Sequence, residues 1–372
     1  MLRKLRRLPI VLQSRLRELP YRRAQYLPAL DRAAVLKDPD ATVYPFGSAE
    51  TITVRPTLRV SDEVPTMLTA HDDLTRTLDQ PYVAEFSDVT LRGQFAFPIH
   101  NRRRLEEAVL LSQYTAWQWA PINYVPDRPP LDLDCAALLT SSGSHNMYFV
   151  WMVHSAMRLR GIQHYIKQTG RRPKLIIPAN AARFVTESLK MLGYTEDDWV
   201  EWRTTKGRVK RFVMPTNARQ GAFFSPETCR WLRDAMIKGA GEPDAGLPKR
   251  IYISRAKARR RVLNEDKVLK LLEPLGFVSY CLEDLPLADQ VKLFYGAEAV
   301  VGPHGAGLTN ILFGHGMTVI ECLGSTRVTN SFMAIAASCG HRYGATYDET
   351  DSPHFAINVA QLQAVMERAG LM

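Results

Sequence analysis

The chain has 372 residues, 46% of them hydrophobic, and a formal net charge of +10. This length exceeds one ordinary core and predicts two domains of about 150 residues each, and the composition excludes a largely disordered chain. The charge favours acidic partners, but no helix-turn-helix, zinc or RNA-binding signature accompanies it, so we expect no nucleic acid. Five cysteines without a Cys-x-x-Cys pair argue against a disulfide framework and predict a reducing compartment.

Residues 1–25 read as a separate basic segment. Leucines recur there every three or four residues with arginines between them, although Pro9 interrupts the spacing. The pattern is typical of an amphipathic helix, which either lies on an anionic membrane surface or packs on a domain. The apolar stretch from Leu8 to Leu12 is too short for a secretory signal, and no apolar run of about 18 residues predicts a membrane span.

The middle of the chain changes from strand patterns to alternating helices and strands. Residues 40–110 show strands and turns, with alternation at 51–54 and 89–92. From residue 145 the elements alternate, with a helix, a strand, a helix ended by Gly193 and a strand over 148–159, 174–178, 181–192 and 211–215. A helix opened by Ser225 and Pro226, followed by a loop over 239–246, marks a boundary near 216–248.

The second half of the chain predicts a doubly wound sheet. Strands are expected at 250–254, 277–281, 299–302 and 318–322. Helices are expected from the capping residue Asn264 and at 288–295, 307–313 and 330–339. Strands that alternate with helices at this spacing predict a parallel sheet with helices on both faces.

The strongest local motif is the run from Val300 to Asn310. A buried strand enters small residues and then a helix, so the backbone can approach a ligand and the first helix amides face it. The run lacks the Gly-Lys-Ser/Thr of a P-loop and the Gly-x-Gly-x-x-Gly of a dinucleotide site. Arg255 and Glu321 end neighbouring strands, where an arginine can hold a phosphate and a carboxylate can accept from ribose hydroxyls. The alternatives are a surface arginine and a helix-capping carboxylate; together the three features favour a nucleotide-diphosphate site.

These segments resemble glycosyltransferase family 61, of the bacterial capsular and surface-polysaccharide type. The resemblance rests on the order and spacing of Ile251–Arg255, Arg260–Glu265, His304–Asn310 and Val319–Glu321, and Pro81–Asp88 resembles the family's amino-terminal strands. It covers roughly residues 80–350. It implies an α/β, GT-B-like fold with two Rossmann-like domains facing across a cleft and a strand-rich N-terminal region. It also implies inversion at the anomeric carbon, with no metal or other cofactor.

The expected domains and site follow from this resemblance. Beyond segment 1–25, we expect an acceptor-side domain at 26–216, a nucleotide-sugar domain at 217–350, and a C-terminal helix in 351–372 that packs back on the N-terminal domain. The expected donor, a uridine diphosphate sugar, would contact Arg255, Arg260, Arg261, His304, Gly305, Ala306, Gly307, Leu308, Thr309, Asn310 and Glu321.

The general base is less clearly marked. The family commonly shows Asn-Tyr-x-His-Trp and then an acidic residue, whereas this chain has Val150 at the histidine position and His154 at the acidic one. Residues 150 and 154 would share a helix face, so His154 could serve the same cleft. His145 is the second candidate, and the alternatives are a core histidine and a helix-capping histidine. Carboxylates at Asp127, Asp132 or Asp134 are further options.

Two other functions remain open. The triplet Asp132-Leu133-Asp134 could hold a divalent metal, as in metal-dependent GT-A glycosyltransferases. A non-catalytic nucleotide- or sugar-binding protein would explain the missing family histidine. The main expectation is an inverting transferase that moves a sugar to a glycan or lipid-linked glycan in surface polysaccharide biosynthesis. We expect it in the cytoplasm, peripheral on the inner face of the cell membrane through residues 1–25.

Overall fold

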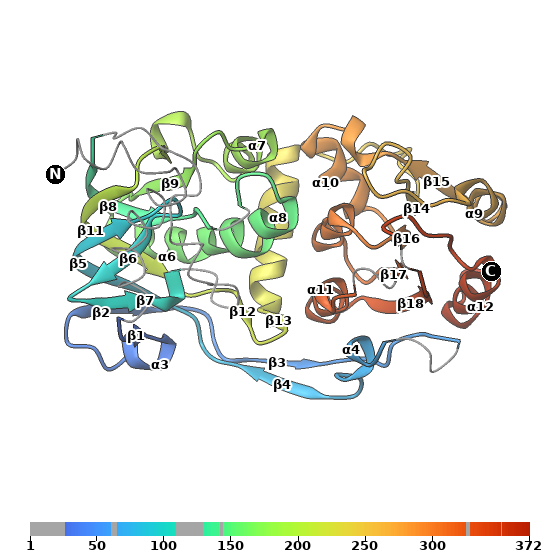
Figure 1. Ribbon diagram of the computed structural model, residues 1–372, viewed down its shortest axis with the longest axis horizontal. Helices are drawn as coiled ribbons and strands as arrows, with labels where there is room; N and C mark the ends of the chain where they lie inside the picture. Colours follow the sequence, from blue (N-terminus) through green and yellow to red (C-terminus); the bar gives the residue numbers. More distant parts are fainter. Residues whose placement is uncertain (1–26, 61–64, 109–128, 142–143, 325–327, 351) are drawn as a thin grey trace, which may run out of the picture. The chain divides into compact units, whose positions relative to one another are not determined.

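The computed structural model describes residues 27–60, 65–108, 129–141, 144–324, 328–350 and 352–372 (Figure 1). The chain forms two compact units. The first comprises Met1–Ser48, Gln80–Thr186 and Tyr194–Ala218, and the second comprises Ala49–Asp79, Glu187–Gly193 and Arg219–Met372. The basic segment 1–25 and the candidate base Asp127 lie outside the described residues.

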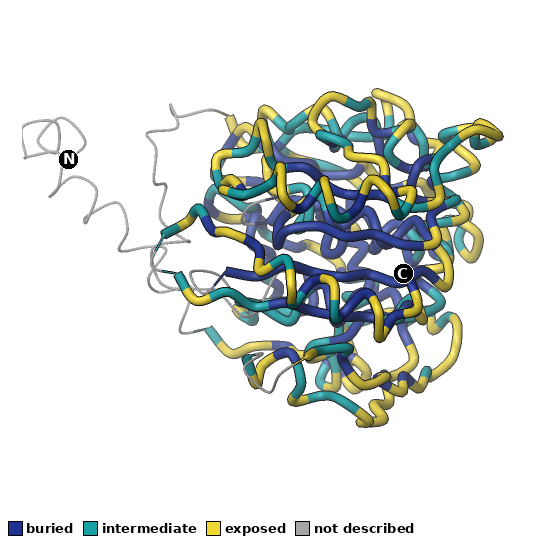
Figure 2. Tube along the Cα trace, turned by 90° about the vertical axis from the view of Figure 1, so that its right-hand side faces the viewer, coloured by how far each residue is buried: buried dark blue, intermediate teal, exposed yellow. Residues whose placement is uncertain are grey.

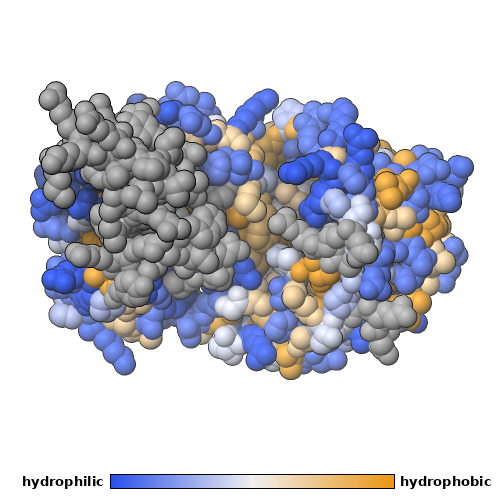
Figure 3. All heavy atoms as spheres, viewed as in Figure 1, coloured by the Kyte–Doolittle hydropathy of each residue, from blue (hydrophilic) through white to orange (hydrophobic). Residues whose placement is uncertain are grey.

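Among the described residues, no helix combines the length and the hydropathy that crossing a membrane requires. Hydrophilic residues form most of the described surface visible in Figure 3, and hydrophobic residues occupy smaller areas among them.

The first unit contains a mixed nine-stranded sheet in its described part, in the order β1-β7-β6-β5-β11-β8-β9-β10, with β2 also paired to β5. Strands β8 to β11 include parallel neighbours, while β5 pairs antiparallel with β2, β6 and β11. The expected strand at 174–178 is confirmed with the same bounds, and those at 89–92 and 211–215 are confirmed as parts of longer strands. The strands are β1 (Ala29–Leu30), β2 (Ala41–Pro45), β5 (Tyr82–Arg92), β6 (Phe97–His100), β7 (Arg103–Leu105), β8 (Leu131–Leu138), β9 (Lys174–Pro178), β10 (Trp199–Trp202) and β11 (Lys206–Pro215).

One continuous helical stretch of the first unit changes its pitch along its length. The helix expected at 148–159 is present, but it passes through α5 (Tyr148–Val150), the π-helical η4 (Trp151–Ser155) and the 3-10 turn η5 (Ala156–Arg158) before α6 (Leu159–Thr169). Helix α6 packs on β5 and β11, where a Cβ on Gly161 would lie 2.7 Å from Pro215. The other helices are α3 (Arg32–Val35), η1 (Glu106–Ala108), η6 (Glu196–Asp198) and α7 (Arg183–Met191), whose last residues belong to the second unit.

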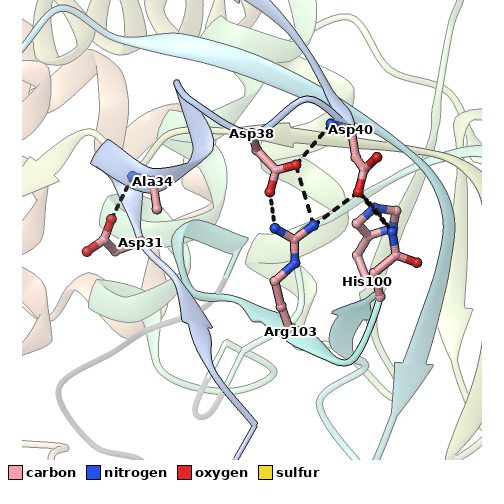
Figure 4. Close-up of polar contacts among 7 residues, drawn as sticks. Asp31, Ala34, Asp38, Asp40, His100 and Arg103 are labelled. Atoms are coloured by element: carbon pink, nitrogen blue, oxygen red, sulfur yellow. Dashed lines mark hydrogen bonds and ion pairs between the residues drawn. The ribbon is translucent and has the colours of Figure 1, made fainter.

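A cluster of charged residues holds the β6–β7 hairpin to the segment before β2 (Figure 4). Arg103 pairs with Asp38, whose side chain is fully buried, and its Nη2 lies 3.1 Å from Asp40 Oδ2. His100 Nε2 lies 3.4 Å from the same Asp40 oxygen. The cluster ties chain segments that are distant in sequence, and therefore has a structural role.

The second unit contains a five-stranded, fully parallel sheet in the order β15-β14-β16-β17-β18. This confirms the alternation expected from the sequence. In Figure 2 the buried stretches of the chain, drawn in dark blue, lie in the interior, and exposed stretches surround them. The chain moves from β14 to one side and then returns to β16 on the other, so the strand order reverses between β14 and β16. The strands are β14 (Arg250–Ile253), β15 (Phe277–Tyr280), β16 (Ala299–Pro303), β17 (Thr318–Gly324) and β18 (Arg342–Asp348).

Helices pack on this sheet in two groups. Apolar residues of α9 and α12 join those of the strands in one buried cluster, and α8, α10, η9 and α11 pack with one another. Ser225 caps α8 as expected, because its Oγ accepts from Thr228 N at 3.0 Å and Pro226 follows it. The expected helix at 307–313 is a 3-10 helix. The elements are α8 (Pro226–Ala240), α9 (Glu265–Leu272), η7 (Glu273–Leu275), η8 (Leu282–Asp284), α10 (Leu287–Tyr295), η9 (Ala306–Phe313), α11 (Ser331–Cys339) and α12 (Val359–Ala369).

Two local expectations are wrong. Helix α12, expected to pack on the N-terminal domain, instead packs on β17, β18 and α9 of the second unit, because Leu362, Val365 and Met366 form an apolar stripe that this sheet buries. Asn264 occupies the N-cap position of α9 without capping it. Its side chain instead exchanges two hydrogen bonds with the backbone of Ile357, at 2.8 and 2.9 Å.

An N-terminal segment also belongs to the second unit. It contains β3 (Glu50–Thr53), which confirms the strand expected at 51–54, α4 (Thr66–Thr69) and β4 (Thr75–Leu78). Leu58 extends the sheet beside β18, accepting from Ala345 N at 3.0 Å and donating to Tyr343 O at 2.9 Å. Two short strands, β12 (Arg219–Gln220) and β13 (Phe223–Phe224), complete the unit's described strands. Nothing in the local sequence of 49–79 signalled this long-range packing.

Candidate functional site

The candidate site lies where the strand order of the second unit reverses. Strands β14 and β16 are neighbours in the sheet, and their carboxyl ends lead into Arg255 and His304 respectively. In open α/β sheets, ligands bind outside the carboxyl ends of the strands at this reversal, because the flanking helices leave there in opposite directions. The topology thus brings together two of the residues that the sequence singled out.

Only one nitrogen of the Arg255 guanidinium has a hydrogen-bond acceptor among the described residues. Its Nη1 donates to His304 O at 2.5 Å, and its backbone amide donates to Glu265 Oε1 at 3.1 Å. No described residue accepts from its remaining guanidinium nitrogens. Burial, and then the nearby charge of Arg260, lower the pKa of Arg255 to about 10. A half-buried cation in a positive environment is the complement of an anion.

Backbone amides of the loop before η9 lie beside the Arg255 guanidinium and are further hydrogen-bond donors. The amides of Gly305, Ala306 and Gly307 have no hydrogen-bond partner among the described residues, whereas the flanking amides of His304 and Leu308 bond to backbone carbonyls. Gly305 allows the close approach, because a Cβ there would lie 3.1 Å from Arg255 Nη1. Consecutive unpaired amides at a helix start form an anion-binding site.

His304 is fixed by a buried carboxylate. Its Nδ1 lies 2.5 Å from Glu321 Oε1, and Tyr343 donates to Glu321 Oε2 at 2.5 Å. Phe332 of α11 packs against the imidazole, with ring centroids 5.3 Å apart. Glu321 is completely buried and His304 is 8% exposed. Because the carboxylate holds the hydrogen on Nδ1, the atom that stays without a partner among the described residues is Nε2.

This arrangement revises one expected contact. We expected Glu321 to accept hydrogen bonds from ribose hydroxyls, but it has no exposed surface and both of its oxygens are engaged by protein groups. It also lies in the middle of β17 and not at the strand end where the sequence placed it, paired with Gly302 of β16 and behind His304. Glu321 therefore orients the imidazole.

The remaining expected donor residues divide into two sets. Leu308, Thr309 and Asn310 are completely buried, and Asn310 Nδ2 donates to Gln290 and to Gly307 O, so these three residues hold η9 in place. The arginines differ from them. Arg260 is half-buried and close enough to lower the pKa of Arg255, while Arg261 is exposed and donates its backbone amide to His354 Nδ1 at 3.1 Å.

The two candidate bases belong to the first unit and differ in environment. His154 lies in the π-helical turn η4, is 7% exposed, and contacts the ring of Phe149 with centroids 6.4 Å apart. His145 is exposed, and its carbonyl accepts from Ala182 N at 2.8 Å. Single π-helical turns occur often at functional sites. The catalytic role of either histidine stays a prediction.

The Asp132-Leu133-Asp134 triplet does not have the geometry that a metal site after a strand would need. Both carboxylates project from within β8 on an exposed face. Asp134 Oδ1 lies 2.7 Å from Lys210 Nζ, and the hydrogen bond from Lys210 lowers the pKa of Asp134. The described part of the chain contains no group of three or more histidine, cysteine, aspartate or glutamate side chains able to hold a metal ion.

Sequence reasoning missed three partners of the site. Tyr343 holds Glu321 from β18, Phe332 packs on His304 from α11, and Glu265 accepts from both Arg255 N and Tyr252 Oη at 3.1 Å. Glu265 ended a segment that carries the family resemblance, but the sequence assigned it no contact. The strand pattern at 342–348 was a usable signal for Tyr343, but the contact itself depends on the order of the strands.

The family model described as Glycosyltransferase 61 matches residues 120–320, so it includes Arg255 and the His304–Asn310 loop and stops one residue before Glu321. Pro81–Asp88 lies outside the match. Curated relatives carry the name EGF domain-specific O-linked N-acetylglucosamine transferase.

The similarity to these relatives is local. The Drosophila melanogaster protein is 35% identical over 105 residues, which is 27% of this chain and 20% of that protein. The Mus musculus and Bos taurus proteins are 29% and 28% identical over 76 residues, 19% of this chain and 14% of each relative. The matches thus span a fifth or less of the relatives' length. The family model covers more than half of the 372 residues, and the chain therefore belongs to the Glycosyltransferase 61 family.

Proposed function

We propose that this chain is an inverting glycosyltransferase of GT-B architecture that takes its sugar from a nucleotide diphosphate donor. The observation that carries the proposal is the set of unpaired donors at the strand reversal of the second unit. Arg255 and three consecutive amides converge where a parallel sheet binds ligands, and membership of the family supplies the chemistry. Uridine diphosphate is the nucleotide that we propose, from the family resemblance.

In this reaction the acceptor hydroxyl attacks the anomeric carbon in line with the departing diphosphate. A base removes the hydroxyl proton, and we propose His154 for this role, with His145 as the alternative. Negative charge grows on the leaving diphosphate as the sugar bond breaks. Arg255, the amides from Gly305 to Gly307 and the neighbouring Arg260 or Arg261 stabilise that charge, so no metal is needed as the counter-charge.

His304 contributes to the same leaving group in this proposal. With Glu321 on Nδ1, only Nε2 remains to meet a ligand. Protonated at both nitrogens, the imidazole would present Nε2–H to a diphosphate oxygen while the buried Glu321 balances its charge. Phe332 and Tyr343 keep this pair in one orientation. Glu321 is thus a positioning residue that acts through His304.

For the acceptor we propose a glycan or lipid-linked glycan in bacterial surface polysaccharide biosynthesis. The names of the relatives describe transfer of N-acetylglucosamine to EGF domains, so a protein acceptor is the competing possibility. We place the enzyme in the cytoplasm, at the inner face of the membrane, through the basic segment 1–25. Binding of the full chain to anionic vesicles should fall with salt, and a chain that begins at residue 26 should not bind. Equal sedimentation of both chains would remove the membrane role.

The experiment that tests the donor site is calorimetry with uridine diphosphate. Arg255→Ala should weaken binding by about 1.5–3 kcal/mol, because a charge-assisted contact to phosphate is lost. Arg259→Ala is the matched control, since Arg259 is an exposed arginine of the same loop, and its affinity should change little. Equal affinities of the wild type and Arg255→Ala would exclude this role for Arg255. Release of free uridine diphosphate from uridine diphosphate sugars would separate an enzyme from a protein that only binds them.

A further inference from the structure

A second candidate site lies in the second unit and shares no residue with the donor site. It is a cavity of about 260 Å³ lined by β3, the first turns of α8, the end of η9 and the last residues of α11. Its lining includes two arginines, one histidine and two cysteines, and no carboxylate. The family motifs do not account for any of these groups.

The two cysteines both line this cavity. Cys229 lies in the second turn of α8 and Cys339 is the last residue of α11, and both are free thiols. The Cys229 and Cys339 thiols lie close enough for their side chains to interact. This contact brings the two sulfur atoms within reach of each other although their positions differ by 110 in sequence.

His341 lies beside the pair and interacts with Cys339. Its Nε2 donates to Ile311 O at 2.9 Å. Nδ1 is buried and completes no hydrogen bond with a described residue. Cys339 is half-buried whereas Cys229 is buried, so a ligand reaches Cys339 first, which makes Cys339 the nucleophile and Cys229 the resolving thiol. The interaction with Cys229, and then that with His341, lowers the pKa of the Cys339 thiol, which favours the same assignment.

The cationic groups indicate what enters the cavity. Arg230 is exposed and no described residue accepts from its guanidinium. Arg233 also lines the cavity; its Nη1 lies 3.2 Å from His315 Nδ1 and its Nε bonds to Asp234, so among the described residues Nη2 has no acceptor. Two arginine side chains in a cavity without a carboxylate favour a ligand with negative groups.

We propose that this cavity is a thiol–disulfide exchange site for a low-molecular-weight disulfide that carries carboxylates. Arg230 and Arg233 bind the carboxylates, and the Cys339 thiolate attacks one sulfur of the ligand. The ligand's S–S bond breaks, one half leaves as a thiolate that takes up a proton, and the other half stays on Cys339. Cys229 then loses its proton and attacks Cys339 Sγ, which releases the second half as a thiol. Two protein thiols are oxidised to a disulfide while one ligand disulfide is reduced to two thiols.

The test exposes the full chain to oxidised glutathione and maps the cysteines by mass spectrometry of peptides. The Cys229–Cys339 disulfide should form before any adduct at Cys281, a half-buried thiol outside the cavity that serves as an internal control. Cys229→Ser should trap a mixed disulfide on Cys339, whereas Cys339→Ser should leave Cys229 unmodified. A faster reaction at Cys281, or no Cys229–Cys339 product, would overturn the proposal.

A second comparison tests the ligand class. Bis(2-hydroxyethyl) disulfide has no charge and should react about tenfold more slowly than oxidised glutathione at equal concentration, because the arginines cannot attract it. The double variant Arg230→Gln, Arg233→Gln should lose that difference while its reaction with the uncharged disulfide stays the same. Equal rates for the two reagents in the wild type would exclude an anion-selective site. These readouts do not depend on sugar transfer, so they stand apart from the proposed function.

Discussion

Each unit contains an arginine that is at least partly buried, and the two are used in opposite ways. Arg158 of the first unit is 4% exposed and donates to the carbonyls of Glu107, Ala108 and Leu138 and to the Asn217 side chain, at 2.6 to 3.3 Å. Arg255 of the second unit is half-buried and donates from its side chain to one carbonyl. A buried cation whose donors are used stabilises the fold, whereas a cation with unpaired donors is prepared for a ligand.

The largest effect on turnover is expected at the candidate base of the first unit. His154→Ala in the first unit should lower kcat by about 10²–10⁴-fold, the range for a positioned base, and leave uridine diphosphate affinity nearly unchanged. Steady-state kinetics and calorimetry on one preparation measure both. His145→Ala is the control, and loss of turnover there alone would move the assignment to His145. If neither change matters, the base is another group.

Arg158→Ala should reduce stability, whereas Arg255→Ala should mainly reduce ligand binding. Removing the guanidinium leaves several buried carbonyl groups without donors, so the free energy of unfolding should fall by about 3–5 kcal/mol. Arg255→Ala should cost less than about 1 kcal/mol, because its loss exposes few polar groups. Urea unfolding compares the two variants directly. Similar stability losses would mean that both arginines are structural.

Glu321→Gln tests, within the second unit, whether a residue that only orients His304 affects ligand binding. The amide keeps the volume but loses the charge, and it cannot accept from both His304 and Tyr343 in the same way. We expect uridine diphosphate affinity to fall about three- to tenfold, or about 0.7–1.4 kcal/mol. Tyr343→Phe keeps the carboxylate and should have a smaller effect. Binding equal to the wild type would show that Glu321 does not act through His304.

Chelation of divalent metal ions should have no effect on turnover, which makes it the smallest of the expected effects. In the proposed mechanism Arg255 and backbone amides replace a metal as the counter-charge, so turnover should be the same with and without EDTA. Activity that is lost in EDTA and restored by manganese would instead favour Asp132 and Asp134 of the first unit. That result would move the donor diphosphate away from the strand reversal.

The sequence alone predicted the parallel sheet of the second unit and singled out the loop at His304, because both depend on local patterns. Buried strands, capping residues and glycine loops alternate at short spacing, and each carries its own signal. The same kind of signal predicted Ser225 as the cap of α8, and it failed at Asn264, where a distant backbone segment competed for the side chain.

The partners of the site were decided by the tertiary structure. The order of the strands places Tyr343 and Glu321 together, and the packing of α11 puts Phe332 on His304 and Cys339 beside Cys229. These contacts join positions far apart in the chain, and no periodicity within one segment encodes them. The sequence could therefore name the candidate site residues, while burial and strand order determined which of them orient a neighbour and which keep donors without a partner among the described residues.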